Sequence, residues 1–491
     1  MEKRSQNKIL SFMSGIAAFF ANLAVALARA ARSVPGRLAG FAGRLKDFFS
    51  RYGADFKNGG ADVRLSYAVM GYGSIKARQL VRGILFLVVE ILFIVFMAAF
   101  GGKAVAGFFT LGTRLPVTVE NEYGITRPLG GDNSLLMLLY GIIAFIIIIC
   151  FISLYFMSVR SSVDALAARA AGKKPKSFRE DLDELLGARL YASMLFIPVL
   201  CVIALTVVPI IYMVLMAFTS YDRNHLPPGS LFGWTGFAAF GKMLSLGGGF
   251  FAVLGWTLIW AFFATFLNYF AGMIVALLIN RKGVRGKKIF RTVFVLTIAV
   301  PQFISLLVMR NFLNLNGPLN EFIANAGMQK IDFLGDPRYN GLIPRISVIV
   351  VNLWVGIPYT MLITSGILMN IPAELYESGR IDGASPARLF ISITLPYILF
   401  ITSPYLIQQF VGNINNFNLI YLLTEGGPVT LGGSGAGRTD LLITWLYKMT
   451  IDEKNYNIGA VIGIFTFLIC AVFSLIVYSQ SGATKREGEF R

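Results

Sequence analysis

Eight long runs of apolar residues constrain this chain more than any other feature of its sequence. They lie at 83–102, 133–159, 190–221, 243–280, 292–309, 346–373, 389–424 and 455–484, and Glu90 is the one charged residue inside them. A helix needs about 20 mostly apolar residues to cross the hydrocarbon core of a bilayer. The runs therefore predict an all-α, polytopic membrane protein with about eight transmembrane helices.

The overall composition agrees with a membrane protein and argues against several kinds of enzyme site. Of the 491 residues, 56% are hydrophobic and 14% are charged, whereas soluble domains carry about 25% charged residues. The three cysteines, Cys150, Cys201 and Cys470, lie in the apolar runs and form no CxxC pair. With one histidine, His225, the chain offers no histidine-based metal site and little basis for a catalytic triad.

The net charge of +18 is distributed unevenly between the loops. If the N-terminus lies in the cytoplasm and eight spans follow, the cytoplasmic segments are 1–82, 158–190, 280–291, 370–390 and 480–491. These segments hold 32 of the 44 Lys and Arg residues, and the outer segments hold 12. Because cytoplasmic loops are enriched in Lys and Arg, this distribution predicts that both termini are cytoplasmic. It also explains the positive charge without nucleic acid as a partner.

Residues 1–60 differ in composition from the rest of the chain. The apolar stretch 9–28 is followed by a series of basic residues, with Leu45, Phe48 and Phe49 at helical spacing among them. This pattern favours a basic amphipathic helix at the surface of an anionic membrane. A further transmembrane span and a cleaved signal peptide stay open as alternatives for 9–28.

The loop at 371–386 carries the clearest local signals. Pro372 suits the first turn of a short helix, because its missing N–H costs nothing there. The pair Asp382-Gly383 is a turn signal that ends this helix. The pair Ser385-Pro386 predicts an N-cap and the first position of the next helix. We therefore expect a short helix, a sharp turn and a new span, on the cytoplasmic side by the charge distribution.

This loop resembles the cytoplasmic EAA loop of ABC importer permeases. The family pattern is EAA, three residues, Gly, nine residues, Ile, any residue and Leu-Pro. Glu377, Gly383, Ile393 and Leu395-Pro396 stand at these positions with every spacing kept, while Ser378-Gly379 replaces the two alanines. The resemblance implies the type I ABC importer permease fold and a coupling helix that docks on a separate ATPase. The residues implied in coupling are Glu377, Ser378, Gly379, Asp382, Gly383 and Ala384.

Two further segments, 352–359 and 413–428, resemble the maltose-type oligosaccharide permeases, and 60–160 resembles the Gram-positive members of that group. In that family, the matching positions line a sugar site within the membrane. The residues implied here are Asn352, Val355, Gly356, Tyr359, Asn413 and Asn416. Amides bind sugar hydroxyls and aromatic faces pack on sugar rings, so these residue types suit such a site. For the three asparagines, hydrogen bonding between helices stays open as an alternative.

The sequence thus predicts three regions: a basic N-terminal segment (1–60), an accessory transmembrane pair with a cytoplasmic linker (61–182) and a transport core (183–484). The resemblance implies a subunit that imports an oligosaccharide across the plasma membrane of a bacterium by alternating access. Its implied partners are a second, homologous permease subunit, two ATP-binding subunits, an extracellular solute-binding lipoprotein and membrane lipids. We expect no cofactor on this chain, because ATP and magnesium are used by the partner ATPase.

Three other functions stay as alternatives. The same architecture could import another polar solute, such as a glycerol derivative or a uronide. An ion-coupled secondary transporter would need paired intramembrane carboxylates, but Glu90 has no evident partner in the other runs, which favours a structural role for it. A membrane-embedded enzyme would need convergent acidic or histidine side chains in the spans.

The glycine-rich segment 432–439 is similar to a phosphate-binding loop, but it has Arg438 in place of the required Lys. We therefore expect no nucleotide site there.

Overall fold

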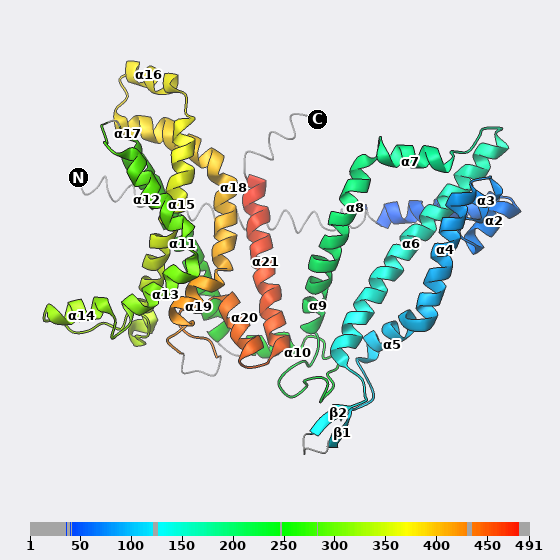
Figure 1. The fold of residues 1–491 in the computed structure, drawn as a ribbon, viewed down its shortest axis with the longest axis horizontal. Coiled ribbons are helices and arrows are strands. Elements are labelled where there is room, and N and C mark those ends of the chain that lie inside the picture. The colour runs from blue at the N-terminus through cyan, green and yellow to red at the C-terminus, as the bar shows by residue number, and fades with distance from the viewer. Residues whose placement is uncertain are drawn as a thin grey trace. The chain divides into compact units, whose positions relative to one another are not determined.

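The apolar runs form helices in the computed structural model, which describes residues 36, 40, 42–120, 126–245, 248–281, 283–429 and 435–480 (Figure 1). Seven helices among these residues are long and apolar enough to cross a membrane, and a bent pair brings the number to as many as eight. The predicted all-α membrane fold is therefore confirmed. The predicted alternatives for 9–28 lie outside the described residues. The seven helices are Leu80–Thr110, Ser134–Ala170, Leu190–Met216, Gly249–Asn280, Arg338–Met369, Pro386–Thr424 and Tyr456–Leu475.

The predicted span at 292–309 is a broken helix rather than a straight one. Lys287–Ala299 and the following segment Gln302–Asn325 meet at an angle of 93°. The break falls at Val300, which is extended with φ −76° and ψ 126°. The residue before a proline is disfavoured in the helical region, so Pro301 accounts for the break.

The chain divides into two compact units, Met1–Trp234 (unit 1) and Thr235–Arg491 (unit 2). The predicted boundary at 182/183 follows sequence resemblance instead, and the three predicted regions stay a prediction. After a helix over 42–58, unit 1 contains α2 (Ala61–Ala68), α3 (Tyr72–Lys76), α4 (Leu80–Phe96), η1 (Met97–Gly101), α5 (Gly102–Thr110), α6 (Ser134–Ala170), α7 (Phe178–Leu186), α8 (Leu190–Val202), η2 (Ile203–Val207) and α9 (Val208–Met216).

Unit 1 also contains a small element that the all-α prediction does not include. β1 (Val117–Glu120) and β2 (Thr126–Leu129) pair antiparallel, with Val117 opposite Leu129 and Glu120 opposite Thr126. Both strands lie in the predicted outer loop 103–132, so the hairpin leaves the order of the spans unchanged.

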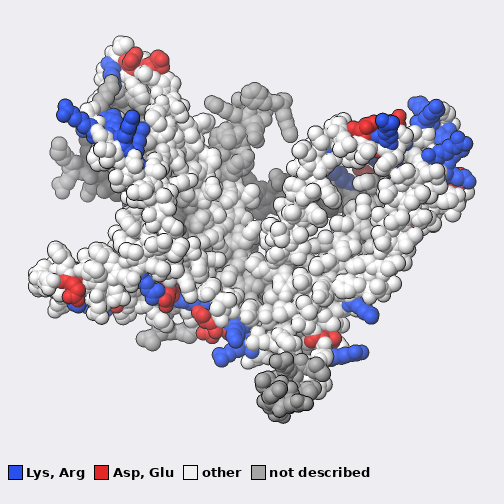
Figure 2. Space-filling view, in the orientation of Figure 1, with Lys and Arg blue, Asp and Glu red and all other residues white. Residues whose placement is uncertain are grey.

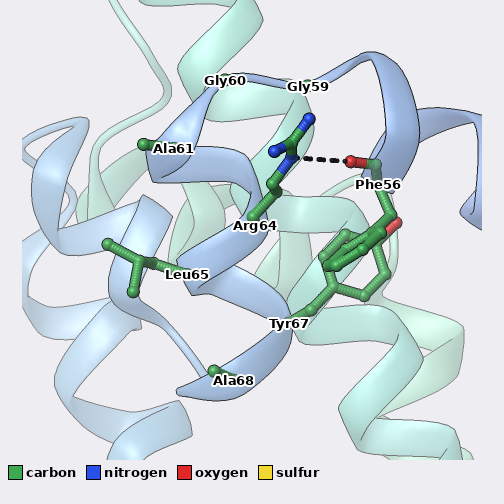
Figure 3. Close-up of a pocket in the computed structure, with 8 residues that line it drawn as sticks. All are labelled: Phe56, Gly59, Gly60, Ala61, Arg64, Leu65, Tyr67 and Ala68. Carbon is green, nitrogen blue, oxygen red and sulfur yellow. Dashed lines mark hydrogen bonds between the residues drawn. The ribbon is translucent and has the colours of Figure 1, made fainter.

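The helix over 42–58 packs on α6 through its aromatic side chains. The rings of Phe48 and Tyr52 each lie 5.0 Å from the ring of Phe156, and the Tyr52 hydroxyl donates to the Phe156 carbonyl. The turn into α2 leaves a hollow of about 730 Å³ at the surface, in which the Arg64 guanidinium donates to the carbonyl of Phe56 (Figure 3). Part of the predicted amphipathic face is therefore covered by the protein itself.

Glu90 has a structural partner in unit 1. Its carboxylate accepts the N–H of Met70 at 2.9 Å, and the next N–H, of Gly71, donates to Ser158 on α6 at 3.0 Å. Gly71 has a φ of +79°, which favours glycine, and it lies against the backbone of Gly83 on α4. The carboxylate thus completes a turn between α2 and α3, which agrees with the structural role favoured from the sequence.

Unit 2 is a helical bundle in which α11 and α15 pack along each other. Figure 2 shows its charged side chains gathered at two ends, with an almost uncharged surface between them. We name these ends by the helices that lie there in Figure 1, the α16 end and the α14 end. The elements are α10 (Ala238–Ser245), α11 (Gly248–Asn280), α12 (Lys287–Ala299), α13 (Gln302–Leu313), α14 (Pro318–Asn325), η3 (Arg338–Gly341), α15 (Leu342–Met369), α16 (Ala373–Ile381), α17 (Pro386–Leu389), η4 (Phe390–Thr394), α18 (Leu395–Ile414), α19 (Phe417–Thr424), α20 (Leu442–Ile451) and α21 (Tyr456–Gln480).

An ion pair holds the loop between α19 and α20. Asp440 is fully buried, and its carboxylate accepts hydrogen bonds from Lys448 at 2.6 Å, from Thr444 at 2.8 Å and from the N–H of Gly437 at 2.6 Å. Burial raises the pKa of the Asp440 carboxyl, while Lys448 acts in the opposite direction. Removal of one member of a buried pair leaves an uncompensated charge, which is more costly than removal of both.

This pair leads to a first prediction. Lys448→Met should destabilise the protein by about 3–5 kcal/mol, because the Asp440 carboxylate loses its counter-ion. The loss should shrink as the pH falls, since a buried acid with a raised pKa becomes protonated and neutral. Thermal unfolding in detergent measures both effects. The double variant Asp440→Asn/Lys448→Met should regain most of the stability, and a double variant as unstable as Lys448→Met would contradict this account.

Candidate functional site

The predicted loop at 371–386 has the local structure that its residues indicate. Pro372 is the N-cap of α16, which ends at Ile381, and Gly383 follows with a φ of +72°. The Ser385 hydroxyl accepts the N–H of Arg388 as the N-cap of α17, with Pro386 at the first helical position. Figure 1 shows α16 at one end of unit 2, joined by α17 to the next span. A short helix, a turn and a new span are therefore confirmed.

Two contacts fix α16 on the span that follows it. The Tyr376 hydroxyl lies 2.8 Å from the Thr394 hydroxyl, within hydrogen-bond distance. A Cβ at Gly379 would lie 2.5 Å from Leu389 Cδ2, so the absence of a side chain lets α16 approach α17 closely. This contact gives Gly379 a physical reason to stand where the family pattern has a small residue.

The span after α16 contains a π-helical turn, η4, directly after α17. The N–H of Leu395 donates to the carbonyl of Phe390, five residues earlier, and Pro396 follows with no N–H to donate. The Leu-Pro pair of the motif thus coincides with a local widening of the helix. Such π-bulges are often found at functional sites.

Much of the surface of α16 is exposed among the described residues. Glu377, Ser378 and Asp382 are exposed, and Ala384 is half-buried. Two large apolar side chains are also exposed there, Ile381 at 86% and Leu375 at 44%. The predicted coupling residues therefore lie on one accessible helix and the turn after it.

Two of the six residues predicted for the substrate site line a small cavity in unit 2. Its volume is about 60 Å³, and α11, α15 and α18 form its walls. Of the predicted residues, Gly356 and Tyr359 line it. The remaining residues that line the cavity were not predicted from the sequence; they are Ala264, Thr265, Asn268, Tyr269, Thr360, Tyr405, Leu406 and Gln409.

The three predicted asparagines are engaged with the protein. The side-chain amide of Asn413 donates to the Thr265 hydroxyl at 2.9 Å, and the backbone carbonyl of Asn413 accepts from the Trp260 indole N–H. Asn416 caps α19 by accepting the N–H of Leu419. Asn352 is buried, with its amide 3.4 Å from the carbonyl of Ala264. The side-chain bonds of Asn413 and Asn352 join α18 and α15 to α11, as the open alternative states, whereas Asn416 caps its own helix. A role of the three asparagines in sugar binding stays a prediction.

Val355 lies with a different group of residues, the apolar cluster toward the α14 end. This cluster joins α11, α13, α15, α19 and α20 and contains buried Trp256, Trp260 and Leu306. Val355 packs against it and does not line the cavity. In this structure, the cluster fills the space between the helices beside the cavity.

Sequence reasoning missed Asn268, Tyr405 and Gln409. The amide of Asn268 occupies the space that a side chain at Gly356 would fill, because a Cβ there would lie 2.5 Å from Nδ2. In this structure, the protein itself therefore uses the space beside Gly356. An amide within the charge-free run 243–280 was the signal that could have identified Asn268.

This chain is similar to known proteins both in sequence and in fold. The family model described as binding-protein-dependent transport system inner membrane component matches residues 268–485. The maltodextrin transport system permease protein MdxF of Bacillus subtilis (strain 168) is 34% identical over 432 residues, which cover 85% of this chain and 95% of MdxF. The galactooligosaccharides transport system permease protein GanP of the same strain is 33% identical over 429 residues, which cover 85% of this chain and 97% of GanP.

A solved structure agrees with the fold. A chain of a bacterial ABC transporter involved in the import of the acidic polysaccharide alginate matches with a TM-score of 0.51 and 23% identity, over 61% of this chain and 97% of that chain. The resemblance predicted from the EAA-like loop is thereby confirmed. The chain belongs to the family of permease subunits of binding-protein-dependent ABC import systems.

Proposed function

We propose that this permease carries an oligosaccharide across the plasma membrane by alternating access, driven by a separate ATPase that docks on α16. One observation carries the proposal: α15 and α18, two of the three helices that line the cavity, are also the spans on either side of α16 in the chain. A displacement of α16 therefore acts on these two walls through covalent connections. This arrangement supports a link between the docking helix and the cavity.

α16 is connected both to the span before it, α15, and to the span after it, α18. On one side, α15 continues through Asn370 and Ile371 into α16. On the other, the Tyr376–Thr394 contact joins α16 to η4, from which α18 extends to Tyr405 and Gln409. Relative movement of α15 and α18 would then enlarge a cavity that, at about 60 Å³, is too small for a sugar ring.

The surface of α16 suits a protein partner. Ile381 and Leu375 offer apolar area, and Glu377 offers a carboxylate to a basic group on the ATPase. In this proposal, two ATPase subunits hold the ATP and magnesium, and this chain binds no cofactor. A second permease subunit completes the pathway, and an extracellular lipoprotein delivers the solute at the α14 end. Both termini are cytoplasmic.

The chemistry of the cavity supports a neutral, hydroxyl-rich solute. Its lining combines three tyrosines, two threonines and two side-chain amides, and none of its residues is charged. Amides and hydroxyls pair with sugar hydroxyls, and aromatic faces pack on sugar rings. The alternative of a uronide would place a carboxylate beside no cationic group, so a neutral sugar is favoured.

The substrate class is tested by reconstitution with the ATPase and the binding protein. Two relatives are named for maltodextrin and for galactooligosaccharides, so the panel contains neutral glucans and galactans. Glycerol phosphate and a uronide are included to test the alternative solutes. We expect at least one neutral oligosaccharide to stimulate ATP hydrolysis. Stimulation by none of the glycans would exclude the proposed substrate.

The docking surface is tested by charge reversal. Glu377→Lys should lose association with the ATPase, because a like charge then meets the basic group that the carboxylate is proposed to contact. Co-purification from detergent measures the association, and membrane insertion should be unchanged. Glu453→Lys, at an exposed glutamate after α20, is the matched control and should keep the ATPase. Undiminished association of the Glu377→Lys protein would contradict the assignment.

A further inference from the structure

Asn268 has an amide oxygen without a partner in the middle of the membrane-spanning bundle. Its Nδ2 donates to the carbonyl of Ala264 on the same helix at 2.8 Å, but Oδ1 is buried and has no hydrogen-bond partner among the described residues. Buried polar atoms in native proteins nearly always have a partner, in the protein, in water or in a ligand. Hydrocarbon offers no donor, so lipid cannot supply one here.

The position of this amide is fixed by its surroundings. A Cβ at Gly356 would lie 2.5 Å from Nδ2 and 2.7 Å from Oδ1, so the amide fills the space beside the glycine. The hydrogen bond to Ala264 holds Nδ2 on its own helix and leaves Oδ1 as the atom available to another donor. Asn268 lines the cavity together with Tyr359 and Tyr405.

Because Asn268 lines the cavity, a hydrogen-bond donor that enters the cavity can become the missing partner when the surrounding helices move apart. In the present state, about 60 Å³ leaves room for water, since a polar cavity of about 10–15 Å³ already holds one water molecule. In an open state, the same position faces whatever solute the cavity admits. We propose that Asn268 Oδ1 accepts a hydrogen bond from a hydroxyl group of the transported solute, and that Gly356 is small in order to hold this amide in place.

This inference rests on the proposed function, and it assigns the glycine a different role from direct contact with substrate. If Gly356 makes room for the amide, a larger residue there displaces Asn268. Gly356→Ala should therefore lower uptake, and Asn268→Gly should add little further loss in the same chain. If the solute contacted Gly356 itself, the two losses would combine independently.

The test is uptake into vesicles that contain the whole complex, with maltotriose and its mono-deoxy analogues as probes. Asn268→Ala should lower uptake of maltotriose about tenfold, the effect of one lost hydrogen bond of about 1.4 kcal/mol. Asn268→Thr should stay within about twofold of the wild type, because its hydroxyl donates to Ala264 and keeps an acceptor in the cavity. Thr466→Ala is the control: this buried residue on α21 also bonds the carbonyl four residues earlier, but it does not line the cavity.

The deoxy analogues separate recognition from structural damage. For the analogue that lacks the paired hydroxyl, Asn268→Ala and the wild type should transport equally well. An equal loss for maltotriose and for every analogue, or no loss at all, would overturn the inference while the wild type still imports sugar. If the wild type imports none of the probes and no galactotriose, the proposed function fails first, and this inference fails with it.

Discussion

Polar groups inside a bilayer must find partners in the protein or in water, and the arrangement of this permease depends on that requirement. In unit 1, the carboxylate of Glu90 and the hydroxyl of Ser158 satisfy backbone N–H groups at a glycine turn. In unit 2, Asn413 joins α18 to α11 through Thr265. These bonds hold helices together where the surrounding lipid favours no particular pairing. Asn268 is informative because its oxygen departs from this rule.

The order of the helices along the chain connects the cavity of unit 2 to α16, the helix proposed to bind the ATPase. The cavity lies between α11, α15 and α18, and two of these helices lead directly into α16. The glycine at 379 and the hydroxyl pair Tyr376–Thr394 keep α16 against the following span. The exposed helix proposed for docking and two of the three cavity walls thus belong to one continuous segment, about 342–414. A rigid connection of this kind suits a transporter that takes its energy from another subunit.

Much of this fold is predictable from the sequence, because the bilayer imposes a length and a polarity on each span. The eight apolar runs and the turn at Asp382-Gly383 are read directly from residue types. The break at Pro301 was predictable from the proline, but the absence of charge indicates only that 292–309 can span the membrane and not how the helix bends. The hairpin of unit 1 lies in a loop whose strands are too short to give a clear period.

The candidate site was predicted less completely, and the reason is physical. Gly356 and Tyr359 line the cavity, but the neighbour of Gly356 there is Asn268, 88 residues earlier on α11. Spacing within one helix indicates which side chains share a face, but it does not indicate which distant helix packs there. For the same reason, Val355 falls in the apolar cluster near Trp256 rather than at the cavity.

The central claim is that ATP-driven movement of α16 separates α15 from α18. The most direct measurement is the distance between spin labels at two exposed positions on these helices, Trp354 and Gln408, in a cysteine-free chain assembled with its ATPase. The account predicts that ATP binding changes this distance and that Glu377→Lys abolishes the change. An unchanged distance in a complex that hydrolyses ATP and transports its solute would contradict it.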